Sequence, residues 1–162
     1  GIFVESDQKR GSTFKILFPQ TSEKSVSEKK KAISKELSQI ENANILLIDD
    51  EESVLKSMQL ILQMHGFQVE GIIDPLKALE LLRSDSKKFD LIITDMTMPG
   101  ICGDELAIEV LKIRHDIPII LTTGFNDKID EKRAKKIGIR KYLEKPFPEQ
   151  EIPQAIQEAI GV

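Results

Sequence analysis

Three aspartates, one threonine and one lysine stand directly after short apolar runs, and together they could carry out phosphoryl chemistry. These residues are Asp49, Asp50, Asp95, Thr123 and Lys145. If the runs are neighbouring strands of a parallel sheet, the five side chains converge at the edge where such sheets bind ligands. Aspartate is a known nucleophile toward phosphorus, while lysine and threonine can neutralise and hydrogen-bond phosphoryl oxygens.

Three carboxylates close together repel one another, so such a site needs additional positive charge. At an effective dielectric near 20, each pair about 4 Å apart costs roughly 4 kcal/mol. One lysine cannot neutralise three aspartates, so the site either takes up a proton or binds a divalent cation. A set of oxygen ligands with room for water favours Mg²⁺.

The segments that must position these residues alternate between strand and helix from residue 44 onward. Apolar runs without polar alternation are typical of parallel strands buried on both faces. The apolar runs at 45–48, 91–93 and 119–121, with two less regular segments at 67–72 and 140–143, predict five strands. Helical patterns are predicted at 52–65, 75–84, 103–114, 127–137 and 149–160. This alternation predicts a doubly wound α/β domain.

Each of the polar residues also has a purely structural interpretation. Asp49 and Asp50 could cap the helix that follows them. Asp95 could belong to a turn, and Thr123 and Lys145 could be ordinary strand-end and loop residues. One shared site explains all these strand ends at once, so the pattern favours a site.

The first 19 residues predict a β-hairpin, with a turn between two short strands. Phe14, Ile16 and Phe18 would share one face of its second strand, because side chains alternate along a strand. A lone two-stranded ribbon is marginal in water. This apolar face therefore needs a cover, and it could pair with a second copy of the chain as a homodimer.

The segment 20–43 is rich in Ser, Glu and Lys and has no aromatic residue. It predicts either a solvated linker or a short amphipathic helix. The helical alternative depends on Ile33, Leu37 and Ile40, which are spaced as one face of a helix.

The composition of the 162-residue chain excludes several classes of protein. Its 23 basic and 27 acidic residues give a net charge of −4, which makes it a poor nonspecific binder of nucleic acid or anionic membrane. The single cysteine, Cys102, excludes an internal disulfide. No apolar run approaches the ~20 residues that cross a bilayer, and no signal peptide is visible. We therefore expect a cytoplasmic protein without membrane contact.

Four short motifs follow one another along 44–162: ILLIDDE at 45–51, DMTMPG at 95–100, Thr123-Gly124, and YLEKPF at 142–147. Together they resemble the receiver domain of two-component response regulators, and the resemblance covers the whole segment. It implies a flavodoxin-like five-stranded parallel sheet of order 2-1-3-4-5 with five helices. It also implies a place in a bacterial phosphorelay, with a histidine kinase or a histidine phosphotransfer domain as the phosphodonor.

The resemblance implies a role for each matched acid. Asp95 matches the phosphoacceptor. Asp50, Asp95 and the backbone carbonyl of Thr97 match the direct ligands of Mg²⁺, and Asp49 matches the acid that acts on the metal mainly through water.

The resemblance also implies a switch. Thr123 matches the hydroxyl that moves toward the phosphoryl group, Lys145 matches the cation that pairs with it, and Tyr142 matches the aromatic residue that rotates inward on activation. The Lys145–Pro146 peptide would be cis. The switched surface would lie within 127–160, where Pro153 predicts an irregular start to the last helix.

Two other functions fit the same residues. A degenerate receiver would keep the fold as a protein-interaction module, although it need not keep all of the matched residues. An aspartyl phosphatase would need a second acid two residues after the nucleophile, and Thr97 occupies that position. In the receiver family the positions of Thr97 and Phe125 help place or block the hydrolytic water. Phe125 cannot orient water, which predicts slow self-dephosphorylation.

The N-terminal motifs GIFVES at 1–6 and GSTFKILFP at 11–19 look like the tail of a histidine kinase ATP-binding domain. The histidine-bearing helix, the Asn-containing box and the glycine-rich lid of that family are missing from this sequence, so we expect no ATP binding by the chain itself. The two resemblances together imply the C-terminal fragment of a hybrid histidine kinase, with a receiver at 44–162 tethered by 20–43.

Overall fold

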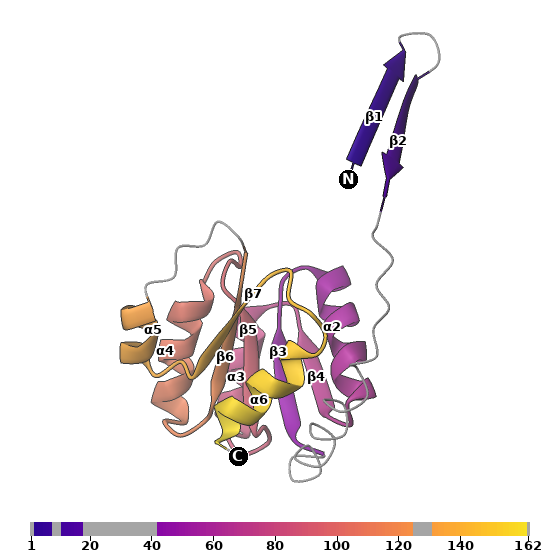
Figure 1. Cartoon of the computed structure of the whole chain (residues 1–162). Helices are drawn as coiled ribbons and strands as arrows, with labels where there is room; N and C mark the ends of the chain where they lie inside the picture. Colours follow the sequence, from indigo (N-terminus) through magenta and orange to yellow (C-terminus); the bar gives the residue numbers. More distant parts are fainter. Residues whose placement is uncertain (1, 8–10, 18–41, 125–130, 162) are drawn as a thin grey trace. The chain divides into compact units, whose positions relative to one another are not determined.

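The computed structural model describes residues 2–7, 11–17, 42–124 and 131–161 (Figure 1). These residues form an N-terminal hairpin and an α/β domain, which are separate units of the chain.

The hairpin consists of β1 (Ile2–Asp7) and β2 (Gly11–Ile16), which pair antiparallel with Val4 opposite Phe14. This confirms the predicted hairpin. Val4, Phe14 and Ile16 are 56%, 67% and 54% exposed, respectively. Phe18 and the predicted linker or helix up to residue 41 lie outside the described residues.

The α/β domain is built on five parallel strands, which confirms the predicted fold (Figure 1). In chain order they are β3 (Asn44–Ile48), β4 (Gln68–Ile72), β5 (Leu91–Asp95), β6 (Ile119–Thr123) and β7 (Lys141–Glu144). They lie side by side in the order β4-β3-β5-β6-β7, which is the predicted 2-1-3-4-5. Every residue of β5 and β6 is buried, as expected of central strands covered on both faces.

Five helices cover the two faces of this sheet (Figure 1). They are α2 (Glu52–Met64), α3 (Pro75–Ser84), α4 (Gly103–Ile113), α5 (Glu131–Ile137) and α6 (Glu151–Ile160). Alternating residues of β3 separate the core into two layers. Ile45 and Leu47 pack with α2 and α6, whereas Leu46 and Ile48 pack with α3, α4 and α5.

The starts of the last two helices are compared with the prediction as far as the structure describes them. The described part of α5 begins at Glu131, because residues 127–130 of the predicted 127–137 lie outside the described residues. Helix α6 begins at Glu151 rather than at 149, with Gln150 in a helical backbone conformation. Pro153 is buried in its first turn, where backbone N–H groups have no partner within the helix, so it does not break α6.

Among the helices that the structure describes, none is long and apolar enough to span a bilayer.

Candidate functional site

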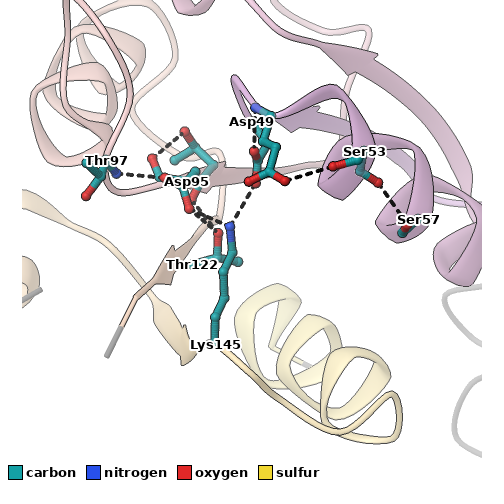
Figure 2. A network of polar contacts seen from close by, with 9 residues as sticks. Asp49, Ser53, Ser57, Asp95, Thr97, Thr122 and Lys145 are labelled. Carbon is teal, nitrogen blue, oxygen red and sulfur yellow. Dashed lines mark hydrogen bonds and ion pairs between the residues drawn. The ribbon is translucent and has the colours of Figure 1, made fainter. Parts of the chain in front are cut away.

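The carboxyl ends of three strands place two acids and a lysine together (Figure 2). Asp49 follows β3, Asp95 is the last residue of β5, and Lys145 follows β7. Asp49 is 4% exposed and Asp95 is 8% exposed. Because all five strands are parallel, these ends lie along one edge of the sheet, as the sequence predicted.

The ammonium group of Lys145 joins the two acids. Its Nζ donates to Oδ2 of Asp49 at 2.8 Å and to Oδ1 of Asp95 at 2.6 Å. The Lys145 backbone N–H donates to the carbonyl of Thr123 at 2.7 Å, which anchors the loop after β7 to the end of β6. The Lys145–Pro146 peptide is cis, as the resemblance implied.

Two opposing effects act on the pKa of Lys145. Burial of the ammonium lowers its pKa, whereas hydrogen bonds and charge attraction from Asp49 and Asp95 raise it. The attraction wins, so the pKa of Lys145 lies above its ordinary value. The lysine is therefore a fixed positive charge at neutral pH.

Backbone amides orient both carboxylates. The N–H of Thr97 donates to Oδ2 of Asp95 at 2.7 Å, and the N–H of Glu51 donates to Oδ1 of Asp49 at 3.0 Å. Hydrogen bonds to ionised acceptors are stronger than neutral ones. Each acid is therefore held by the loop that follows its own strand as well as by Lys145.

The first residue of α4 packs directly on the backbone of Asp95. A Cβ atom added to Gly103 would lie 2.2 Å from the Asp95 carbonyl oxygen and 2.7 Å from Cδ1 of Leu121. The N–H of Gly103 also donates to the carbonyl of Met96 at 2.8 Å. Glycine at this position thus permits the close approach of α4 to the strand that carries Asp95.

The other predicted site residues differ in how far they are exposed. Asp50, next to Asp49, and Thr97 are both exposed. Thr123 is 3% exposed at the end of β6, and Tyr142 is 37% exposed on the edge strand β7. Phe125 lies outside the described residues.

Sequence reasoning missed Thr122, which contacts the carboxylate of Asp95. Thr122 lies opposite Asp95 in the register of β5 and β6, and its Oγ1 is 3.4 Å from Asp95 Oδ1. The pair Thr122-Thr123 at the end of a predicted strand could have indicated this contact. Adjacent residues of a strand point to opposite faces of the sheet, so either threonine could face Asp95. The motif match directed attention to Thr123.

The arrangement differs in one respect from the predicted ring of three acids around a dication. In the described parts of the chain, no three His, Cys, Asp or Glu side chains form a ready-made metal-binding group. The ammonium of Lys145 lies between Asp49 and Asp95 instead. Two carboxylates and one ammonium leave a surplus negative charge, to which Asp50 adds. In charge and in donor type, these oxygen ligands fit a hard dication such as Mg²⁺.

Comparisons with known proteins match both the sequence and the fold. The sequence pattern called "Response regulator receiver domain" matches residues 45–157. A receiver domain protein from Clostridium thermocellum has a similar structure, with a TM-score of 0.69 and 33% identity over 73% of this chain and 94% of that one. Chemotaxis protein CheY4 of Vibrio cholerae gives a TM-score of 0.66 at 28% identity, over 73% and 98% of the two chains.

Two curated relatives are much longer than this chain. Sensor kinase CckA of Brucella abortus is 26% identical over 98% of this chain but only 18% of its own length. Two-component response regulator ARR10 of Arabidopsis thaliana is 32% identical over 72% of this chain and 21% of its own length. The chain thus spans about a fifth of each of these relatives.

Proposed function

Because this chain belongs to the response regulator receiver domain family of two-component signalling, we propose that Asp95 accepts a phosphoryl group from a phosphohistidine. The donor would be a histidine kinase or a histidine phosphotransfer domain. The observation that carries this proposal is the contact of the Lys145 ammonium with both Asp49 and Asp95, at 2.8 and 2.6 Å.

In the proposed reaction, a carboxylate oxygen of Asp95 attacks the phosphorus atom of the phosphohistidine in line. An O–P bond forms while the P–N bond breaks, and the imidazole leaves with the electron pair and regains neutrality by proton exchange with water. The Thr97 N–H, 2.7 Å from Asp95 Oδ2, restrains the nucleophile, and Lys145 supplies positive charge beside it.

Mg²⁺ is the proposed cofactor. Asp50, Asp95 and the carbonyl of Thr97 would hold it directly, and Asp49 would act on it through water. When bound, the ion offsets negative charge on the phosphoryl oxygens.

The proposed response to phosphorylation is a shift between two conformations that changes the surface formed by residues 127–160. Thr123 would approach the phosphoryl group and Tyr142 would turn inward. Two contacts support a path between them: Leu121 lies opposite Tyr142 in the sheet, and the Thr123 carbonyl accepts the Lys145 N–H at 2.7 Å.

A small phosphodonor tests the central proposal. Incubation with Mg²⁺ and acetyl phosphate should add about 80 Da, the mass of HPO₃ on an aspartyl nucleophile. Asp95→Asn should abolish the adduct, whereas Asp74→Asn should not, because Asp74 caps α3 after the outer strand β4. No adduct on the unaltered protein, or an equal yield from Asp95→Asn, would reject the proposal.

We further propose slow self-dephosphorylation. Phe125 follows Thr123 by two positions and cannot orient a water molecule by hydrogen bonding. Phe125→Glu should therefore shorten the lifetime of the phosphorylated protein, followed as loss of the adduct with time. A longer lifetime in this variant would count against the proposal.

We also propose that the chain is the cytoplasmic C-terminal part of a hybrid histidine kinase. Residues 1–19 would be the end of its ATP-binding domain, 20–43 a linker and 44–162 the receiver. The match to sensor kinase CckA supports this, because it covers 98% of the chain and so includes the hairpin region.

The exposed hairpin face of Val4, Phe14 and Ile16 suggests that the isolated chain forms a homodimer. Light scattering should then report a dimer that becomes a monomer when residues 1–19 are deleted. A monomer before deletion, or a dimer after it, would contradict the hairpin-mediated pairing.

A further inference from the structure

Thr122 is a buried hydroxyl next to the proposed phosphoacceptor (Figure 2). Thr122 is 1% exposed, and it lies on β6 directly opposite Asp95 of β5. The hydroxyl oxygen is 3.4 Å from Asp95 Oδ1 and 3.4 Å from the carbonyl oxygen of Thr94. One hydroxyl proton therefore has two acceptors, one of them the carboxylate.

Two further donors to Asp95 come from loops. The N–H of Thr97 and the ammonium of Lys145 both follow the ends of strands. Thr122, in contrast, belongs to a fully buried interior strand of the sheet. Packed interior side chains hold their position more closely than loop residues do. Thr122 is therefore the donor with the most rigid support.

Rigid support matters because the terminal torsion of an aspartate is soft. Its carboxylate plane has a broad, roughly two-fold rotational profile, so hydrogen bonds determine its orientation. In the proposed reaction, the ammonium group of Lys145 also interacts with the incoming phosphoryl group. The hydroxyl of Thr122 can remain on Oδ1 during that change, because it does not reach out of the core.

We propose that Thr122 is a positioning residue that orients the carboxylate of Asp95 for phosphorylation. This inference rests on the proposed function of Asp95. The carbonyl of Thr94 also satisfies the hydroxyl, so the fold does not depend on the contact with the carboxylate. Thr122 acts through Asp95 and does not touch the phosphodonor.

A role in positioning predicts a particular kinetic signature. Small misplacements of a reacting group lower the rate of the chemical step. Thr122→Val should lower the maximal rate of adduct formation from acetyl phosphate about three- to tenfold. The donor concentration at half-maximal rate should stay the same, because the donor itself loses no contact.

Three further variants isolate the hydroxyl. Thr122→Ser keeps it and should react at nearly the rate of the unaltered chain, whereas Thr122→Ala should be as slow as Thr122→Val. The Ser and Ala variants differ only in the hydroxyl, so they test the inference even if Val perturbs folding. Thr94→Val is the matched control, because the Thr94 hydroxyl is 1% exposed but donates to the backbone carbonyl of Asp95.

A second readout does not require phosphorylation. In the full chain without metal, the Asp95 carboxyl ¹³C resonance should shift and broaden in Thr122→Val and Thr122→Ala, and it should change little in Thr122→Ser and Thr94→Val. Equal rates and unchanged spectra in Thr122→Val would overturn the inference. So would a Ser variant as slow as Ala, or a Thr94→Val variant as slow as Thr122→Val. Failure of the unaltered chain to form any adduct would reject the proposed function, while the spectra would still test the contact.

Discussion

The side chains of Asp104 and Arg133 form an ion pair that ties α4 to α5, with Arg133 Nη2 2.7 Å from Asp104 Oδ2. The two partners differ in environment, because the Asp104 side chain is 11% exposed and that of Arg133 is 62% exposed. Asp104 also follows Gly103, the residue that packs on the Asp95 backbone. The ion pair thus connects the short helix α5 to the end of the strand that carries Asp95.

Removing the arginine should destabilise the fold by a measurable amount. Arg133→Gln leaves the nearly buried Asp104 carboxylate without this partner, and the exposure of Arg133 limits the effect to about 1–2 kcal/mol. Urea unfolding measures this free energy. The control is Lys112→Gln, which removes a more exposed pair with Glu109 and should change stability by less than about 0.5 kcal/mol. Equal losses in the two variants would show that the burial of Asp104 has no energetic consequence.

Substitution of Gly103 should be costly even though alanine is the better helix former. The added Cβ would lie 2.2 Å from the backbone oxygen of Asp95, so α4 must move away from β5. Gly103→Ala should lower the free energy of unfolding by about 1–3 kcal/mol. Gly71→Ala should be milder, because its nearest contacts, at 3.1–3.3 Å, are side-chain atoms of Gln59 and Leu55. Denaturant titration of both variants compares them, and a neutral Gly103→Ala would contradict the close packing.

The contact of Lys145 with Asp49 and Asp95 should respond to pH in one direction. The pKa of Lys145 is raised in the folded chain, despite burial, by these two acids. Its contribution to stability is therefore complete below its ordinary pKa of 10.5 and is lost as the pH rises through the higher folded value. Titration of the Lys145 side chain by NMR should give a midpoint that falls in Asp49→Asn. The control Asp90→Asn, which alters an acid that accepts the N–H of Asn44 at 2.8 Å, should leave the midpoint unchanged.

Magnesium should stabilise the folded chain if the acids at the sheet edge bind it. A ligand at ten times its dissociation constant adds about 1.4 kcal/mol to the free energy of unfolding. Thermal unfolding should therefore shift upward with Mg²⁺, and removal of the metal by a chelator should reverse the shift. Asp50→Asn should diminish it, whereas Glu70→Gln, which alters a half-exposed pair with Lys88, should not. An equal Mg²⁺ response in Asp50→Asn would place the ion elsewhere.

The sheet could be predicted because its signals are local. Runs such as 45–48 and 91–93 lack polar alternation, which leaves burial on both faces as the consistent explanation. Asp49, Asp95 and Lys145 stand at the ends of predicted strands, so a parallel sheet brings them to one edge. The order of the strands was implied by the family resemblance, because periodicity does not specify which strands are neighbours.

The contacts within the site could not be predicted because they join distant segments. Nothing in the local sequence indicates that Lys145 bridges Asp49 and Asp95, since that depends on side-chain conformations at three strand ends. The same holds for Thr122, whose contact with Asp95 depends on the register between β5 and β6. These are tertiary relationships, and residue type and spacing do not encode them directly.

Lys145 lies 96 positions after Asp49 and 50 after Asp95, yet it touches both. A nascent chain leaving the ribosome exposes the two acids first and lacks their common counter-charge until the final strand has been synthesised and has docked. Docking of β7 and assembly of this charge cluster are therefore the same event. A chain truncated before β7 would carry the acids without the means to hold them together.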